Sequence, residues 1–396
     1  MRTLGTRLLG SVLLLATALA PAVAQQAQES DMLRLLVTAD EYKEEWFSDA
    51  LQQQLNPLQL QQQLNRLLSD VGELEFIDGE DGEYSLFFEE AIVSATIVLD
   101  ERGQVNTIWF RPPAPRADSF DDLLGRLREL PGETALLVVR DGERVAEHNA
   151  DTPLSVASAF KLAVLAAAVE AQDDGSIDRS DVAYLNSSDR TLPTGIMQEW
   201  PEDTAVTVDT LMVQMMSMSD NTATDALMRI LGRERVDEFA SEAQPVVPTT
   251  REMFTLLGPD ARDLADEWAQ AESRQEFLAL LERTAARDMG RIRDFTGGDL
   301  RSDVGWVFTA AELASLAERV AGAAAAGVTQ GAATGADWSD VVYKDGYVPG
   351  VAAEVVHGRD TDGRAHTIVL LWNREDADVD VLELYGLIQT AVRLTQ

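Results

Sequence analysis

The sequence predicts an α+β fold, in which one antiparallel sheet is flanked by helices and is preceded by a small α+β domain. Strand-like alternation occurs near residues 134–148 and again near 341–372, and helical periodicity fills the stretch between them. A second group of helices and strands ends at a proline-rich linker, residues 112–115, which stiffens the chain. We therefore expect three parts: residues 1–24, a small domain over residues 25–115 and a larger domain over residues 116–396.

The first part has the pattern of a secretory signal peptide. Arg2 and Arg7 form a basic region, Leu8–Ala20 is apolar, and Ala22-Val23-Ala24 is a small-residue cleavage site before Gln25. The apolar run is too short for a membrane-spanning helix. We therefore predict export to the periplasm or beyond, without a membrane anchor.

Composition narrows the set of partners. Lys and Arg total 32 against 68 Asp and Glu, which gives a formal net charge of −36. Such a surface repels nucleic acid and anionic lipid, so we expect neither as a partner. The absence of cysteine excludes lipoprotein anchoring, disulfides and thiol chemistry. No His/Cys/Asp cluster has metal-ligand spacing, so we predict no metal and no cofactor. The oligomeric state is left open.

In the small domain, leucines recur at helical spacing from Leu51 to Leu68. Alternating patterns then predict strands at Tyr84–Phe88, Ala91–Leu99 and Val105–Phe110, with turns at Asp78-Gly79 and Arg102-Gly103. This domain has no histidine and no clustered reactive groups, so we interpret it as a docking or substrate-shaping module.

The larger domain is predicted to begin and end with strands. The strands are Thr134–Arg140, Arg144–His148, Val341–Lys344, Gly350–Val356 and His366–Trp372. The helical stretches are Ser119–Leu130, the run after Ser158, Ala205–Leu231 with a polar break at Ser217–Asn221, Glu252 to about Ala325, and Val381–Leu394.

Ser158 and Lys161 precede a wholly apolar run, Leu162–Val169. Residues three apart lie on the same face of a helix, so the Lys161 amine can reach the Ser158 hydroxyl. A helix that is apolar all round is buried, and burial lowers the pKa of a lysine. Lys161 is therefore a candidate base toward a serine nucleophile.

Lysine is rare in this chain. Only Lys43, Lys161 and Lys344 occur, whereas arginine occurs 29 times. Because arginine stays protonated and a buried lysine does not, positions that keep lysine are candidates for chemistry. We interpret Lys161 and Lys344 in this way and Lys43 as a chance occurrence.

Two further triplets carry polar groups in unusual places. Ser219-Asp220-Asn221 breaks an amphipathic helix, and Lys344-Asp345-Gly346 ends a β-branched strand. Taken singly, the Ser-Asp-Asn triplet is typical of a helix cap and the Lys-Asp-Gly triplet of a turn. In this order after Ser158, at spacings of 61 and 125 residues, they form a strong joint signal.

Ser158-Ala159-Phe160-Lys161, Ser219-Asp220-Asn221 and Lys344-Asp345-Gly346 resemble the S-x-x-K, S-D-N and K-T-G set of class A β-lactamases and penicillin-binding proteins. The resemblance covers roughly residues 117–396, while residues 25–115 are similar in layout to a small domain that precedes this one in some secreted relatives. It implies a β-lactamase/transpeptidase-like fold and a serine hydrolase that forms an acyl-enzyme. The implied substrate is a small β-lactam, ester or amide, including cell-wall-derived ones.

The resemblance also implies a role for each motif residue. Ser158 would be the acylated nucleophile and Lys161 its base, Ser219 would relay a proton to the leaving group, and Asn221 would orient Lys161 or a substrate carbonyl. Lys344 would supply positive potential near Ser219.

In the third motif, the backbone N–H groups of Tyr347 and Ser158 would form the oxyanion hole. Asp345, before Gly346, stands where the family has a hydroxyl that hydrogen-bonds a substrate carboxylate. Unless Lys344 compensates, acidic β-lactams should therefore bind poorly, whereas neutral esters or amides are less affected.

Besides Asp345, the sequence departs from the family in the residues that serve deacylation. Class A enzymes carry a glutamate on a loop after the second motif, and it activates water. Here only a short segment leads to Thr249–Glu252, and neither Glu242 nor Glu252 matches that glutamate. We therefore expect slow deacylation.

Two rival readings compete with this one. A Ser-His-Asp hydrolase would need one of His148, His357 and His366, which we interpret as structural or surface residues. The alternative function is a catalytically silent, lactamase-like binding protein of the periplasm or cell wall.

Overall fold

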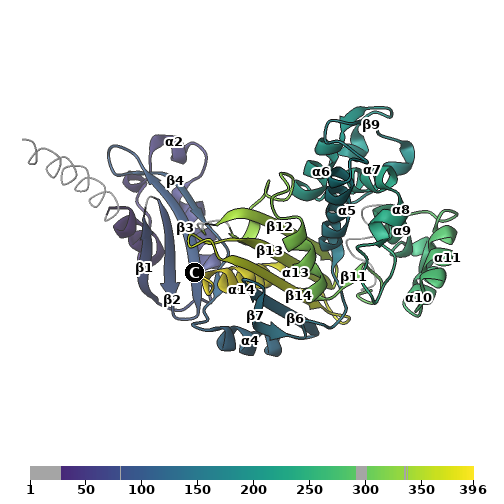
Figure 1. Cartoon of the computed structure of the whole chain (residues 1–396). Coiled ribbons are helices and arrows are strands. Elements are labelled where there is room, and N and C mark those ends of the chain that lie inside the picture. The colour runs from purple at the N-terminus through teal and green to yellow at the C-terminus, as the bar shows by residue number, and fades with distance from the viewer. Residues whose placement is uncertain (1–27, 81, 291–300, 334–335, 337) are drawn as a thin grey trace, which may run out of the picture. The chain divides into compact units, whose positions relative to one another are not determined.

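The computed structural model describes residues 28–80, 82–290, 301–333, 336 and 338–396 (Figure 1). The signal peptide predicted over residues 1–24 lies outside this range. The chain divides into two compact units, Met1–Arg116 and Ala117–Gln396. Among the described residues, no helix combines the length and apolarity needed to cross a bilayer.

The N-terminal unit consists of helices and one antiparallel sheet. Residues 28–38 are helical, followed by η1 (Glu44–Trp46), α2 (Asp49–Gln52) and α3 (Pro57–Leu67). The sheet has the order β1 (Leu74–Glu80), β2 (Glu83–Phe88), β3 (Ala91–Leu99) and β4 (Val105–Phe110), and β5 (Ala114–Pro115) also pairs with β3. Leu60 and Leu64 of α3 pack into one apolar core with Leu86 and Ile97 of the sheet.

One local prediction in this unit was wrong. Asp78-Gly79 lies inside β1 rather than in a turn, since both residues pair with β2 and the chain reverses between Glu80 and Glu83. Gly82, with a φ of 86°, supplies the positive φ that a two-residue hairpin turn requires. Ala114–Pro115, within the predicted proline-rich linker, pairs with β3, and proline is tolerated there because this short strand lies at the edge of the sheet.

The C-terminal unit is built on a second antiparallel sheet, as the sequence predicts. Its order is β12 (Ser339–Val348), β13 (Val351–Arg359), β14 (Ala365–Asn373), β6 (Glu133–Arg140) and β7 (Glu143–His148). Alternate residues along these strands enter two separate cores. Leu136 and Leu370 pack with α4 (Phe120–Glu129) and α14 (Val381–Arg393), whereas Leu137 packs with the helices of the other face.

A helical region lies between β7 and β12 in the chain. Its helices are α5 (Lys161–Asp173), α6 (Val208–Ser217), α7 (Asn221–Leu231), α8 (Arg233–Asp237), α9 (Thr250–Leu256), α10 (Arg262–Trp268), α11 (Arg274–Thr284) and α13 (Ala310–Arg319). Short segments join them: β8 (Leu154–Ser155), η2 (Ala157–Phe160), β9 (Val182–Tyr184), η3 (Ser187–Asp189), η4 (Met197–Glu199), β10 (Ala205–Thr207), η5 (Pro259–Ala261), β11 (Val307–Phe308) and η6 (Gly331–Ala333).

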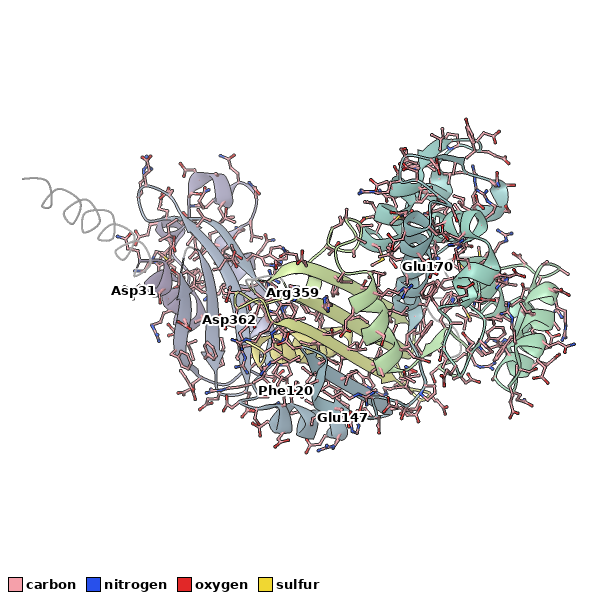
Figure 2. The ribbon with its side chains drawn as sticks, viewed as in Figure 1. Asp31, Phe120, Glu147, Glu170, Arg359 and Asp362 are labelled. Carbon is pink, nitrogen blue, oxygen red and sulfur yellow. The ribbon has the colours of Figure 1, made fainter. Side chains whose placement is uncertain are left out.

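Helix α5 is the central element of this region. Its residues Leu162–Ala168 are all fully buried, which the apolar sequence predicts. Near its C-terminal end, Glu170 (Figure 2) pairs with Arg319 of α13 at 3.1 Å, and α13 in turn contacts strands β6, β13 and β14 of the sheet. The complete burial of this apolar run places α5 inside the core of the unit.

Candidate active site

Ser158 lies in a short 3₁₀ turn, η2, rather than inside the long helix that follows. The turn is fixed by Asn373 of β14, whose side chain accepts from Ser155 N and donates to Ser155 O, at 2.9 Å each. Ala157 has a φ of 44°, which reverses the chain just before Ser158. Ser158 remains partly exposed, whereas Lys161, the first residue of α5, is fully buried.

The Lys161 amine joins the first two motifs. Its Nζ lies 3.3 Å from Ser158 Oγ and 3.0 Å from Ser219 Oγ. It donates to the Ser219 carbonyl at 2.7 Å and to Asn221 Oδ1 at 2.8 Å. Four of the five predicted motif residues with side-chain roles therefore meet at one nitrogen.

The contacts of this amine suit a proton acceptor. The Ser219 carbonyl and Asn221 Oδ1 can only accept hydrogen bonds, so they take two N–H groups. Burial, and then the positive charge of Lys344, hold the pKa of Lys161 well below that of a free lysine. Once neutral, the amine keeps a single lone pair, which can accept from the hydroxyl of Ser158 or from that of Ser219.

The second motif forms the predicted break between α6 and α7. Asp220 caps α7 by accepting from Ala223 N at 2.9 Å. Its other carboxylate oxygen accepts from the backbone N–H groups of Ile196 and Met197. Ser219 has a φ of 51°, in the left-handed region, which turns its carbonyl and its hydroxyl toward the same amine.

A strap of residues 191–194, which sequence reasoning missed, holds this motif in place. Leu192 O accepts from Asn221 Nδ2 at 3.0 Å, which directs Asn221 Oδ1 to Lys161. Thr194 Oγ1 donates to the Ser219 carbonyl at 2.7 Å, and Asn221 N donates to Thr194 O. No motif marks this segment, because its backbone atoms make most of the contacts.

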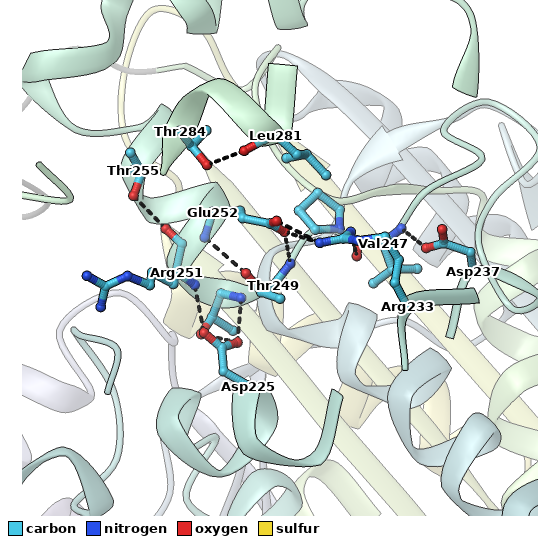
Figure 3. Close-up of polar contacts among 12 residues, drawn as sticks. Asp225, Arg233, Asp237, Val247, Thr249, Arg251, Glu252, Thr255, Leu281 and Thr284 are labelled. Carbon is cyan, nitrogen blue, oxygen red and sulfur yellow. Dashed lines mark hydrogen bonds and ion pairs between the residues drawn. The ribbon is translucent and has the colours of Figure 1, made fainter. Parts of the chain in front are cut away.

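Asp225 of α7 anchors both this strap and α9, and sequence reasoning also missed it. Its carboxylate accepts from Thr191 Oγ1, from Thr250 N and Oγ1, and from Arg251 N (Figure 3). Burial raises the pKa of Asp225 to about 6, although these hydrogen bonds oppose the rise. The sequence feature that could have identified Asp225 is an aspartate on the buried face of a helix.

The third motif lies on β12, at the edge of the sheet. Lys344 is buried and its Nζ donates to Asp345 O at 2.7 Å and to Asp345 Oδ1 at 2.8 Å. Burial acts to raise the pKa of Asp345, but the Lys344 charge and hydrogen bond hold it below the usual value. The Lys344 ammonium therefore compensates Asp345. Among the described residues, its recorded contacts do not include the Lys161 amine, Ser158 or Ser219.

Gly346 allows this strand to approach η2 closely. A Cβ at Gly346 would lie 2.3 Å from Val156 O, 2.7 Å from Ser158 N and 2.9 Å from Ala159 N. These distances are shorter than real Cβ contacts, so only glycine fits without movement. The following residue, Tyr347, is 48% exposed, and its hydroxyl donates to Asp378 at 2.6 Å.

Of the two acids considered for deacylation, Glu252 is paired with an arginine and Glu242 is exposed. Both oxygens of Glu252 lie 2.6 Å from Arg233 Nη2, and Glu252 also closes the capping box of α9 with Thr249 (Figure 3). Glu242 is exposed, and its backbone N–H donates to Glu312. Neither is recorded in contact with the Lys161 cluster in the described part of the chain.

The histidines have partners outside this cluster. His357 Nδ1 lies 2.9 Å from Thr367 Oγ1, and His366 Nε2 lies 2.9 Å from Asp360 Oδ2. The third, His148, contacts Asn149. None of the three is a partner of Ser158 in the described part of the chain, where the ionisable side chain in contact with Ser158 is that of Lys161.

The structure therefore combines an antiparallel sheet flanked by helices with a contact between a serine and a lysine side chain at the start of a buried helix. The sequence profile of the beta-lactamase enzyme family matches residues 117–316, about half of the chain. The chain belongs to this family.

Several solved structures are also similar to this chain. PBP-A is 13% identical with a TM-score of 0.46, covering 69% of this chain and 95% of its own. A beta-lactamase from Sphaerobacter thermophilus DSM 20745 is 17% identical with a TM-score of 0.46, covering 70% and 94%. One from Desulfarculus baarsii DSM 2075 is 19% identical with a TM-score of 0.47, covering 70% and 99%. None of the curated proteins compared with the chain matches it.

Proposed function

We propose that this protein is an exported serine hydrolase that acts through an acyl-serine intermediate. The observation that carries the proposal is the buried Lys161 amine, 3.3 Å from the partly exposed Ser158 hydroxyl and held by two acceptor-only oxygens. A lysine with a lowered pKa in this position activates a serine as a histidine does elsewhere.

In the proposed reaction, Lys161 accepts the Ser158 proton while Oγ forms a bond with the substrate carbonyl carbon. The backbone N–H groups of Ser158 and Tyr347 stabilise the oxyanion. The bond to the leaving group then breaks, and the proton passes from Lys161 through Ser219 to the leaving atom. The close approach of Gly346 to Ser158 N supports this arrangement. Lys344 contributes positive potential near Ser219.

Deacylation is the slow step of the proposed cycle. Water must attack the acyl-serine, and general-base assistance typically contributes about 10²–10⁴-fold in rate. Glu252 is held by Arg233, and Glu242 is exposed and pairs through its backbone with another element. The acyl-enzyme should therefore accumulate.

The substrate is a β-lactam, an ester or an amide, including one from the cell wall. Residues 1–24 are proposed to be removed on export, so the exported chain would begin at Gln25. An exported chain whose mass still includes these residues would contradict cleavage. Within the described residues, the recorded contacts of the Lys161 amine are with Ser158, Ser219 and Asn221 of the larger domain.

Burst kinetics with a chromogenic reactive ester test the slow-deacylation proposal. We expect a rapid release of about one equivalent of leaving group per enzyme, followed by slow steady turnover, because acylation outpaces hydrolysis. The matched control variant Glu242→Gln should leave both phases unchanged. Steady turnover without a burst would contradict slow deacylation, and no release at all would favour the catalytically silent binding protein.

A further inference from the structure

Asn221, whose side-chain oxygen accepts from the Lys161 amine at 2.8 Å, is held from two sides. Its Nδ2 group donates to Leu192 O at 3.0 Å, and its backbone carbonyl lies 3.2 Å from Thr250 Oγ1. An amide whose nitrogen donates on one side presents its oxygen on the other. The direction of the Asn221 oxygen, and with it the place of the amine, therefore depends on Leu192 and Thr250.

Asp225 is bonded to both of these supports. It lies one helical turn after Asn221 on α7, so the two side chains share a face of the helix. One carboxylate oxygen accepts from Thr191 Oγ1 of the strap, and the other accepts from Thr250 Oγ1, at 2.8 Å each. The backbone N–H groups of Thr250 and Arg251 donate to the same carboxylate at 2.7 and 2.9 Å (Figure 3). Four donors therefore converge on Asp225.

This arrangement suits an ionised carboxylate. A carboxylate accepts all four hydrogen bonds, whereas a carboxylic acid must use one of its oxygens as a donor. The Thr250 hydroxyl has a single hydrogen and two neighbouring acceptors, Asp225 at 2.8 Å and the Asn221 carbonyl at 3.2 Å. Protonation of Asp225 would turn one acceptor into a competing donor. The hydroxyls that it now orders would then be released.

Asp225 also acts on Lys161 through its charge. Burial, and then the charge of Lys344, lower the pKa of Lys161. The carboxylates of Asp220, Asp225 and Asp345 oppose that lowering. Removal of the negative charge of Asp225 should therefore lower the pKa of Lys161 further, because a charged amine loses an attractive neighbour.

The charged groups that face Asp225 from the neighbouring elements have partners of their own. In the part of the chain that the structure describes, they line a cavity of about 280 Å³ beside it: Asp189 from η3, Arg229 from α7, Arg233 from α8 and Arg251 from α9. Arg229 pairs with Asp189 at 2.8 Å, and Arg233 pairs with Glu252 at 2.6 Å. The Arg251 guanidinium donates to a backbone carbonyl at 3.1 Å. Within these residues, the Asp225 carboxylate is therefore stabilised by its four hydrogen bonds.

We propose that Asp225 is a positioning residue for the reaction and that its carboxylate form is the active one. As a carboxylate it holds the strap and Thr250, which keep Asn221 directed at the Lys161 amine. When Asp225 takes up a proton, these contacts loosen and acylation slows. This inference rests on the proposed function, to which it adds a control by pH.

The burial of Asp225 sets the pH at which this control operates. Burial raises its pKa to about 6, and the hydrogen bonds from Thr250 and Thr191 and from the backbone oppose the rise. Above pH 6 the carboxylate and its contacts are complete, and below pH 6 the protonated form predominates. Besides the titration of Lys161, the acylation rate of the wild-type protein should therefore fall by about a further tenfold as the pH drops through 6, as for a lost hydrogen bond to a charged group.

The pH dependence of kcat/KM with a neutral reactive ester tests the proposal, because it reports the ionisations of the free enzyme. Asp225→Asn keeps the size of the side chain and removes its charge. This variant should lower the rate at high pH by about tenfold, which is the loss of a hydrogen bond to a charged group. It should also lose the step near pH 6 and move the midpoint of the Lys161 titration to lower pH. A general weakening of the fold would lower the rate without moving that midpoint.

Asp237→Asn is the matched control. It is the same substitution at another buried side chain, 5% exposed, which pairs with Arg274 and accepts from Val247 N at 2.7 Å. Both midpoints should stay where they are in the wild-type protein. A shift of the Lys161 midpoint in this variant equal to that in Asp225→Asn would overturn the inference.

Thr191→Val separates the hydrogen bonds of Asp225 from its charge, and it decides the matter if Asp225→Asn does not fold. It removes one donor to the carboxylate, so the step near pH 6 should move to higher pH while the Lys161 midpoint stays. A wild-type profile without the step, or a step that Thr191→Val does not move, would overturn the inference while the hydrolase proposal stands. Failure of the ester to acylate the wild-type protein at any pH would instead overturn the proposed function.

Discussion

Ser158→Ala is expected to reduce the rate of acylation by about 10⁴-fold or more, because it removes the atom that bonds to the substrate. Ser158 is partly exposed, and its recorded side-chain contact is with Lys161, so the fold should remain intact. The burst amplitude with a reactive ester measures the effect, and circular dichroism checks the fold. A Ser158→Ala protein that still shows the burst would mean that another residue is the nucleophile.

Lys161→Met tests the base separately and should lower acylation by about 10²–10⁴-fold. Methionine fills most of the space of the buried lysine, so this variant avoids the cavity that alanine would leave in the core. In the wild-type protein the acylation rate should rise with pH up to the lowered pKa of Lys161 and then level off, because only the neutral amine accepts a proton. The variant should lose this rise. An unchanged pH profile would assign the base to another group.

Gly346→Ala is a third change with a large expected effect. It should slow acylation by about 10²-fold or more, which is the loss that a displacement of reacting groups by roughly 1 Å produces. The added Cβ would lie 2.3 Å from Val156 O and 2.7 Å from Ser158 N. Both are backbone atoms of a turn fixed by Asn373, so β12 must move away from it. Acylation rates with a neutral reactive ester measure the loss.

Gly125→Ala in α4 is the matched control for this glycine. No atom lies within 4 Å of a Cβ built there, and alanine stabilises a helix interior by about 1 kcal/mol relative to glycine. This variant should acylate as the wild-type protein does and melt slightly higher. If Gly346→Ala behaves like Gly125→Ala, the close approach of β12 to Ser158 has no bearing on the reaction.

The larger fold could be predicted because its patterns are local and strong. Alternation over 134–140 and 366–372, and the apolar run after Lys161, depend on burial alone, and the structure forms β6, β14 and α5 there. The turn prediction at Asp78-Gly79 failed because the cross-strand register, which a single segment does not encode, placed the reversal beyond Glu80.

For the site, the rarity of lysine was more informative than any single motif. It singled out Lys161 and Lys344, and the structure places the first at the junction of Ser158, Ser219 and Asn221. The strap of residues 191–194 could not be predicted, since its role lies in backbone carbonyls that every sequence has. The ion pair of Lys344 with its own neighbour Asp345 depends on rotamers and was likewise outside the reach of sequence.

The most direct test of the central claim is intact-mass spectrometry of the protein after incubation with a penicillin and, separately, with a reactive neutral ester. A mass increase of one acyl group is expected with the neutral ester, stable long enough to be mapped by peptide digestion to Ser158. A smaller extent of labelling is expected with the anionic penicillin. An adduct that maps to another residue, or no adduct and no product with either reagent, would contradict it.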